Sequence, residues 1–369
     1  MKVFNLIWGF STGGIGKCFL TYASLGGVNP KVEVTSVCID IQNREYDRKP
    51  LHEIDATLIS IKHSFDISWI TRLARLIKEE KPDLIFCHGF NGPVVVLLTK
   101  LFYGIRVPMV CSYHGIYHAP TGIKKIIAPL YNGVQIFCYK KYAERVITVE
   151  KNSLKYLESK GVNPSKLMVV HNGIIDDSIS NNKLELEGLK SEGISVGVVS
   201  RLVPIKGLVY LIKAITLIKE EVSTPFKLFI IGDGPEEETL KTLVQSEQIT
   251  DLVHFVGYQS NIQDWLNSLD VFVLSSLHEC HSISLLEAMR ASKAIVATDV
   301  GGNTESVRDG LDGLIVPAKN PKELADAIVK LMKSEELRIT LGESARNRFL
   351  NEFTEDIMKN KLVKALTLN

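Results

Sequence analysis

The sequence predicts an α/β protein made of two doubly wound, Rossmann-like domains that face each other across a cleft. Short β-branched, apolar runs alternate with longer segments of helical periodicity along the whole chain. Continuous apolar strands separated by helices indicate parallel sheets that are covered on both faces. This scheme occurs twice, and 369 residues are enough for two domains with separate cores.

In the first half of the chain, six apolar runs predict strands, and one segment between them has the apolar spacing of a helix. The predicted strands are 2–10, 31–39, 83–89, 108–115, 145–150 and 167–173, and the predicted helix is 67–81. We assign 1–177 to an N-terminal domain.

The second half repeats the arrangement after a polar linker, 178–192. The predicted strands are 194–202, 226–234, 253–258, 271–276, 294–299 and 313–317, and helical patterns cover 208–221, 235–247 and 321–350. We assign 193–350 to the C-terminal domain and expect a final helix in 351–369 to pack back on the N-terminal domain.

The composition excludes several classes of protein. The 43 basic and 42 acidic side chains nearly cancel, so nucleic acid is not an expected partner. Six scattered cysteines without C-x-x-C pairs are typical of reduced thiols in the cytoplasm. The N-terminus lacks the features of a signal peptide, and no apolar run is long enough for a spanning helix. We therefore expect a cytoplasmic protein.

Ligands of doubly wound sheets bind at the carboxyl ends of the strands, so we expect the site residues in the loops that follow the strands. The first, "FSTGGIGKC", does not match a P-loop or a G-x-G-x-x-G motif. Gly13 and Gly14 allow a close backbone approach to a ligand, although a plain tight turn explains them equally well.

Two cations follow the strand 194–202. Arg201 and Lys206 are either solvated surface charges or a pair that embraces a diphosphate, with arginine capable of bidentate contact.

The stretch "SLHECHSISLLEAM", 276–289, allows three interpretations. A metal site would use His278, Cys280 and neighbours, but adjacent residues on a short loop seldom converge on one ion. Glu279 and Glu287 as an acid–base pair would require that their carboxylates meet, which the spacing does not show. Ser284 and Glu287 also form an S-x-x-E capping box that predicts a helix start near Ser284, where backbone N–H groups suit phosphate.

A segment without acidic residues lies between Leu84 and Ala143. The range 121–145, which overlaps the end of this segment, places lysine pairs at both ends of an apolar run, as in a helix that lies on an anionic membrane. A core helix with solvated ends is the alternative interpretation. If the membrane interpretation holds, the protein is peripheral on the inner face of the cytoplasmic membrane.

Taken together, these motifs resemble the retaining, metal-independent GT-B glycosyltransferases of family 4. The resemblance covers nearly the whole chain and is strongest over 193–317. It is carried by "SRLVPIKG", "IGDGP", "VHFVGY", the glutamates with seven residues between them, "IVATDVGGNTESV" and "GLDGLIVP", and in the first half by "GG", "SYHG" and "VVHNGI".

The resemblance implies a nucleotide-sugar donor, with UDP favoured over GDP, and no metal or other cofactor. It also implies a glycan or lipid-linked acceptor that the N-terminal domain 1–177 binds, as in bacterial polysaccharide or glycolipid synthesis, while the C-terminal domain 193–350 binds the donor. By position, Arg201 and Lys206 resemble the cations that bind the donor diphosphate. Glu287 resembles the carboxylate that binds the ribose hydroxyls, and Glu279 resembles the carboxylate near the sugar hydroxyls. His114 resembles a residue that contacts the sugar. The remaining expected donor-binding residues are Gly13, Gly14, Gly234, Tyr258, His281, Ser282 and Ile283.

One loop departs from the family pattern. Cys280, His281 and Ser282 stand where the family usually has glycine, an aromatic or apolar residue, and glycine or proline. This change affects the expected wall of the sugar pocket and hence the identity of the sugar. Two alternatives stay open at this point: a GT-B nucleotide-sugar epimerase, and a non-catalytic relative that binds sugar nucleotides.

Overall fold

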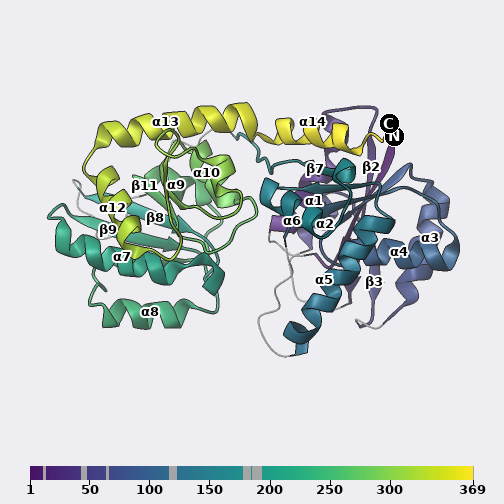
Figure 1. Ribbon diagram of the computed structural model, residues 1–369, viewed down its shortest axis with the longest axis horizontal. Coiled ribbons are helices and arrows are strands. Elements are labelled where there is room, and N and C mark those ends of the chain that lie inside the picture. The colour runs from purple at the N-terminus through teal and green to yellow at the C-terminus, as the bar shows by residue number, and fades with distance from the viewer. Residues whose placement is uncertain are drawn as a thin grey trace. The chain divides into compact units, whose positions relative to one another are not determined.

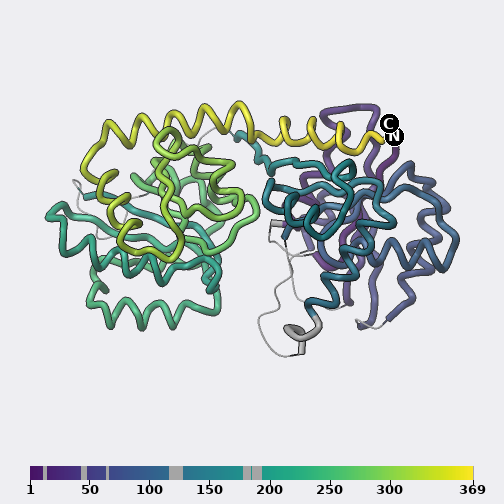
Figure 2. Tube along the Cα trace, in the orientation of Figure 1, coloured from purple at the N-terminus to yellow at the C-terminus, as the bar shows by residue number. Residues whose placement is uncertain are grey.

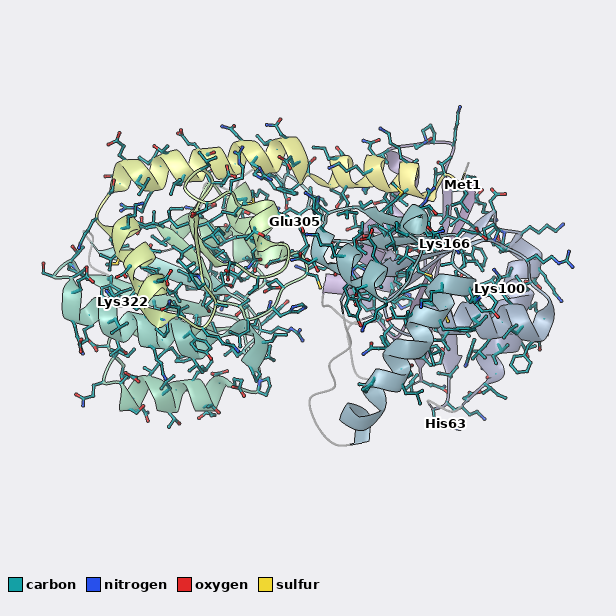
Figure 3. The ribbon with its side chains drawn as sticks, in the orientation of Figure 1. Met1, His63, Lys100, Lys166, Glu305 and Lys322 are labelled. Carbon is teal, nitrogen blue, oxygen red and sulfur yellow. The ribbon has the colours of Figure 1, made fainter. Side chains whose placement is uncertain are left out.

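The computed structural model describes residues 1–10, 14–42, 48–63, 66–115, 123–177, 184 and 193–368, and Figure 3 draws side chains of this part on the ribbon. The chain divides into two compact units. Unit 1 contains Met1–Asn172 and Glu355–Asn369, and unit 2 contains Gly173–Thr354. Both ends of the chain therefore belong to unit 1 (Figure 2). The expected linker, 178–192, lies outside the described residues except for 184.

Unit 1 is a seven-stranded parallel sheet in the order β3-β2-β1-β4-β5-β6-β7 (Figure 1). Its strands are β1 Lys2–Trp8, β2 Glu33–Ile41, β3 Thr57–Ile61, β4 Leu84–His88, β5 Met109–Tyr113, β6 Arg145–Thr148 and β7 Leu167–Val169. Its helices are α1 Gly14–Ala23, α2 Lys49–Glu53, α3 Ser68–Glu80, α4 Gly92–Tyr103, α5 Ile123–Lys141, α6 Lys151–Ser159 and α14 Glu355–Leu366.

Helices cover both faces of this sheet, as the apolar strands require. One core cluster joins the sheet to buried residues of α3, α4, α5 and α6. The clusters of the opposite face contain α1, α2 and α14. The C-terminal helix α14 thus contributes Met358 and Leu362 to the core of unit 1.

Unit 2 is a six-stranded parallel sheet in the order β10-β9-β8-β11-β12-β13. Its strands are β8 Ile194–Val199, β9 Phe226–Ile231, β10 Val253–Gly257, β11 Val271–Leu274, β12 Ala294–Thr298 and β13 Leu314–Val316. Its helices are α7 Leu208–Glu221, α8 Glu237–Ser246, α9 Ile262–Ser268, α10 Ile283–Arg290, α11 Asn303–Ser306, α12 Pro321–Met332 and α13 Glu335–Glu352.

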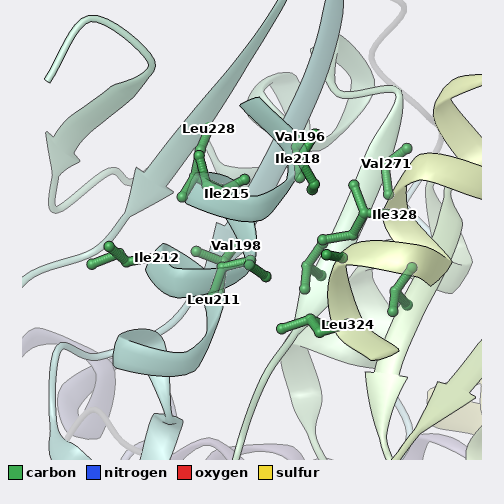
Figure 4. Packing of buried hydrophobic residues seen from close by; sticks show 14 of the residues in the cluster. Val196, Val198, Leu211, Ile212, Ile215, Ile218, Leu228, Val271, Leu324 and Ile328 are labelled. Atoms are coloured by element: carbon green, nitrogen blue, oxygen red, sulfur yellow. The ribbon is translucent and has the colours of Figure 1, made fainter. Parts of the chain in front are cut away.

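The core of unit 2 also has two sides. On one side, α7, α8 and α12 pack on alternate strand residues such as Val196 and Val198, and Figure 4 shows Leu211, Ile215 and Ile328 in this layer. On the other side, α9, α10 and α13 cover the intervening strand residues. The two sequence-predicted doubly wound domains are confirmed.

Candidate active site

The loops that carry Arg201, Lys206 and Glu279 lie at the point where the strand order of unit 2 reverses, whereas Tyr258 follows the edge strand β10. From β8 the chain proceeds through β9 to β10 on one side and then returns to place β11 on the other side of β8. Arg201 and Lys206 follow β8, and the loop 275–282 follows β11. Loops that diverge from two adjacent strands leave a crevice at their carboxyl ends, the usual ligand position in this type of fold.

An ion pair joins these two loops. Lys206 Nζ lies 2.6 Å from Glu279 Oε1, and the two side chains are only 17% and 10% exposed. The same carboxylate oxygen accepts a hydrogen bond of 2.7 Å from Ser276 Oγ. The resemblance implied four catalytic residues, which are Arg201, Lys206, Glu279 and His114. Two of them, Lys206 and Glu279, are therefore in direct contact, although 73 positions separate them in the sequence.

Backbone contacts reinforce this junction. Leu277 N–H donates to the Ile205 carbonyl at 2.8 Å, and Ser275 Oγ donates to the Lys206 carbonyl at 3.1 Å. Gly207 adopts φ +63°, and a Cβ at this position would lie 2.2 Å from the Ser275 carbonyl oxygen. Only glycine combines this conformation with so close an approach.

A glycine pair after β12 supports the loop 275–282 from the other side. A Cβ on Gly301 would lie 1.5 Å from the Glu279 carbonyl oxygen, and one on Gly302 would lie 2.1 Å from that of Cys280. Gly302 N–H donates to the Cys280 carbonyl at 2.8 Å. The pair belongs to the motif "IVATDVGGNTESV", but the sequence did not reveal that it positions the backbone of Glu279.

The start of α10 differs from the expectation. The N-cap is Ser282, whose Oγ accepts from Leu285 N–H, and the helix begins at Ile283. The predicted capping box of Ser284 and Glu287 is therefore wrong, because Glu287 lies in the second turn of the helix.

The N-terminus of α10 presents donors beside the ion pair. The N–H groups of Ile283 and Ser284 have no carbonyl partner within the helix, because they belong to its first turn. Ser282 Oγ is engaged in capping and lies 3.1 Å from Ser284 Oγ. The positive end of the helix and these N–H groups suit an anionic group.

His281 is directed into the core of unit 2. Its ring is 5% exposed, Nε2 lies 3.1 Å from Ser306 Oγ, and the ring centroid lies 5.4 Å from that of Phe353. The histidine thus fixes the back of the loop. At this position only the backbone is placed to contact a nucleotide-sugar donor.

The same geometry bears on a metal site. Cys280 Sγ and His278 Nε2 lie 4.0 Å apart, while the His281 ring faces Ser306. Within the described part of the chain, no group of three or more His, Cys, Asp and Glu side chains is placed to hold a metal ion.

The loops after β8 and β9 complete this edge of the sheet. Leu202 N–H donates to the Asp233 carbonyl at 2.7 Å, and a Cβ on Gly234 would lie 2.4 Å from the Leu202 carbonyl oxygen. Arg201 is exposed and forms no ion pair with a described residue, and Tyr258 is 73% exposed after β10. These residues are available to a ligand at the strand ends.

Three expected site residues lie in unit 1. Gly13 falls outside the described residues, and Gly14 is the first residue of α1. His114 follows β5, is half-buried, and has Nε2 3.0 Å from Ser112 Oγ. Burial lowers the pKa of His114 to about 4, so the ring is neutral at neutral pH.

The expected membrane segment is largely α5. Residues 121 and 122 and the side chains of 123–127 lie outside the described part. Along the rest of the helix, Leu130, Val134 and Phe137 are exposed, and Lys141 continues their stripe. None of the described helices is long and apolar enough to cross a membrane.

Two family models match the chain in succession. Residues 28–178 match the model described as "Glycosyltransferase Family 4", and residues 181–348 match the one described as "Glycosyl transferases group 1". The two parallel sheets with their covering helices and the strand-end site define a GT-B type of glycosyltransferase. The chain belongs to the group 1 glycosyltransferases of family 4.

Individual relatives agree with this assignment. The chain is 28% identical over 324 residues to N-acetyl-alpha-D-glucosaminyl L-malate synthase of Bacillus anthracis, which covers 85% of this chain and 82% of that protein. It is 25% identical over 296 residues to UDP-Gal:alpha-D-GlcNAc-diphosphoundecaprenol alpha-1,3-galactosyltransferase of Escherichia coli, covering 78% and 76%. It is 30% identical over 278 residues to an uncharacterized glycosyltransferase of Methanocaldococcus jannaschii, covering 73% and 71%.

The fold agrees as well. The crystal structure of Anabaena HepE in complex with UDP superposes with a TM-score of 0.81, at 20% identity and with 99% of each chain covered. The protein is therefore an enzyme of the glycosyltransferase class with two Rossmann-like domains.

Proposed function

We propose that this enzyme transfers a sugar from a UDP-sugar to a lipid-linked or glycan acceptor of bacterial polysaccharide or glycolipid synthesis. In this proposal the transfer retains the anomeric configuration of the sugar and requires no metal ion. The observation that carries the proposal is the Lys206–Glu279 pair at the strand-order reversal, beside the N-terminus of α10. The name of the Escherichia coli relative gives alpha-D-GlcNAc-diphosphoundecaprenol as its acceptor, and HepE, which has a similar fold, was crystallised in complex with UDP.

The chemistry follows from where negative charge develops. Departure of the sugar builds charge on the leaving diphosphate. Lys206, Arg201 and the N–H groups that begin α10 can stabilise that charge without a divalent cation. In a retaining reaction the acceptor hydroxyl attacks from the face on which the diphosphate leaves. As the bond to the diphosphate breaks and the bond to the acceptor oxygen forms, an oxygen of the departing diphosphate takes the hydroxyl proton, so no enzymic base is required.

Glu279 and Glu287 have separate tasks in this scheme. Glu279 holds Lys206 and faces the sugar hydroxyls. Glu287, in the second turn of α10, binds the ribose hydroxyls. Gly234 and Tyr258 lie beyond β9 and β10, on the side where the base is accommodated. His114 contributes a sugar contact from unit 1.

The decisive experiment compares two lysines. Lys206→Met should lower kcat by about 10²–10³, the loss that follows removal of one transition-state donor. Lys213→Met changes an exposed lysine on α7 of the same unit and should leave kcat unchanged. The assay uses UDP-glucose, UDP-galactose and UDP-N-acetylglucosamine with undecaprenyl-diphosphate-linked sugar and with L-malate as acceptors. Equal activity of the two variants would contradict the proposal.

Three further readouts examine the finer points. Product NMR should show the anomeric configuration of the donor, and an inverted product contradicts retention. EDTA should leave turnover intact, whereas a loss restored by zinc contradicts metal independence. Donor conversion without any acceptor would favour an epimerase, and greater thermal stabilisation by GDP than by UDP would overturn the nucleotide assignment.

The exposed face of α5 provides the membrane contact in this proposal. Leu130, Val134 and Phe137 can enter the headgroup region while Lys140 and Lys141 meet anionic phosphates. The opposite face of the helix, with Gln135, Cys138 and Tyr139, is buried in unit 1. Such contact would bring the enzyme to a lipid-linked acceptor.

Sedimentation with phospholipid vesicles tests this contact. Wild type should bind vesicles that contain phosphatidylglycerol more strongly than phosphatidylcholine vesicles. Leu130→Ser, Val134→Ser and Phe137→Ser together should reduce binding at least severalfold. The matched control, Ile339→Ser with Leu350→Ser, removes exposed apolar residues of α13 and should have no effect. Equal losses in both variants would contradict the assignment to α5.

A further inference from the structure

A row of buried polar side chains crosses the centre of the first sheet and ends at His114. Ser36 on β2, Asn5 on β1, His88 on β4 and Ser112 on β5 are between 1% and 4% exposed. These strands are neighbours in the sheet, in the order β2-β1-β4-β5. We call these four residues the polar row. Buried polar groups in such a position must be hydrogen-bonded, so the direction of each bond is constrained.

The direction of the row is set at Asn5. Its Nδ2 lies 3.0 Å from the Phe19 carbonyl oxygen and 3.1 Å from Ser36 Oγ. A carbonyl oxygen can only accept, so the amide NH₂ group faces Phe19 and the amide oxygen faces the opposite way. Asn5 Oδ1 lies 2.6 Å from His88 Nε2. Because Oδ1 can only accept, His88 Nε2 carries a proton.

The next two bonds follow from this one. Burial holds the pKa of His88 well below its ordinary value, so the ring is neutral and its Nδ1 has no proton. Ser112 Oγ lies 2.8 Å from this Nδ1 and donates its only proton to it. The same Oγ lies 3.0 Å from His114 Nε2, and it can only accept there. His114 Nε2 must therefore be the protonated nitrogen.

We propose that Asn5, His88 and Ser112 fix His114 as the Nε2–H tautomer, so that any group in contact with its unprotonated Nδ1 must donate a hydrogen bond, as a sugar hydroxyl can and a phosphate or carboxylate oxygen cannot. The functional part rests on the proposed function, in which His114 contacts the donor sugar. Ser112 and His88 are then positioning residues: they act through His114 and do not touch the substrate.

The tautomer can be measured in the full chain without any ligand. Long-range ¹H–¹⁵N correlation of ¹⁵N-labelled protein at pH 7 separates protonated from unprotonated ring nitrogens. The His114 pattern is assigned by its loss in His114→Gln. Wild type should show Nε2 of His114 protonated and Nδ1 unprotonated. A protonated Nδ1, or an averaged mixture of tautomers, would overturn the proposal.

Variants of the polar row test the cause. Ser112→Ala should convert the single His114 tautomer into a mixture, and Ser112→Thr, which keeps the hydroxyl, should restore it. Ser36→Ala removes a buried serine of the same row, but Asn5 keeps its bond to the Phe19 carbonyl, so the tautomer should not change. An unchanged tautomer in Ser112→Ala, or equal changes in Ser112→Ala and Ser36→Ala, would contradict the assigned direction.

Kinetics then separates this inference from the proposed function. Ser112→Ala should reduce kcat/KM by roughly tenfold, comparable to the loss of one hydrogen bond, while Ser36→Ala should not. If wild type transfers no sugar, the proposed function fails, but the measured tautomer still decides the structural part. If transfer occurs and His114→Gln leaves kcat/KM unchanged, the sugar contact is wrong while the tautomer assignment stands.

Discussion

The close approach between Gly301 and Glu279 allows a quantitative prediction. Gly301 has φ +52°, and an added Cβ would lie 1.5 Å from the Glu279 carbonyl oxygen. Gly310 has a similar φ of +70°, but no atom would lie within 4 Å of its Cβ. The variants Gly301→Ala and Gly310→Ala therefore share the backbone cost of a left-handed alanine and differ in the steric contact.

The two costs can be separated. A left-handed conformation costs a non-glycine residue about 1–2 kcal/mol, which is the whole effect expected for Gly310→Ala. Forcing atoms into a packed position adds about 1–3 kcal/mol, so Gly301→Ala should destabilise unit 2 by about 2–5 kcal/mol. The backbone of Glu279 must also move, so Gly301→Ala should lose most of its thermal stabilisation by UDP.

Tryptophan fluorescence can follow unit 2 alone. The sequence has three tryptophans: Trp8 and Trp69 lie in unit 1, and Trp265 lies on α9 of unit 2. In a background with Trp8→Phe and Trp69→Phe, urea unfolding monitored at Trp265 reports on unit 2. Equal destabilisation by the two glycine variants, with equal response to UDP, would refute the view that Gly301 positions the loop.

Two other predictions concern the helix start and pH. Ser282→Ala should destabilise unit 2 by about 1 kcal/mol, the usual contribution of an N-cap residue, whereas Ser284→Ala should have little effect. Urea unfolding monitored at Trp265 measures both variants. The reverse result would restore the capping box of Ser284 and Glu287. The folded-state pKa of His114, about 4, is below the unfolded value of about 6.5, so its contribution to stability is present above pH 6.5 and is lost as pH falls towards 4. Urea unfolding of unit 1 at pH 7 and pH 5 should therefore show a smaller difference in His114→Gln than in wild type.

The sequence predicted most of the fold because buried parallel strands are continuous apolar runs. Strand β9 is such a run and was expected at its observed position. Strand β3, Thr57–Ile61, was missed because it is an edge strand with alternating exposed and buried positions. The pattern 321–350 was written as one helical stretch, but the structure divides it into α12 and α13, with Ser334 as the cap of the second helix.

Less of the candidate site could be predicted, because its contacts depend on the order of the strands. The sequence placed Lys206 and Glu279 at strand ends but could not show that they meet. The N-cap was misassigned because Ser282 and Ser284 both fit the local pattern, and the choice depends on where Gly301 and Gly302 hold the loop. The polar row was invisible for the same reason, since its members come from four strands.

The ion pair gives Lys206 and Glu279 different tasks in the proposed mechanism. In the free enzyme Glu279 holds the ammonium group in place, so Lys206 needs no rearrangement when charge develops on a diphosphate. Like-charge repulsion keeps the Glu279 carboxylate away from that diphosphate. In the proposed function, its remaining hydrogen-bonding capacity is therefore directed to neutral donors such as sugar hydroxyls. Under that proposal the ion pair divides the strand-end site into a phosphate side at Lys206 and a sugar side at Glu279.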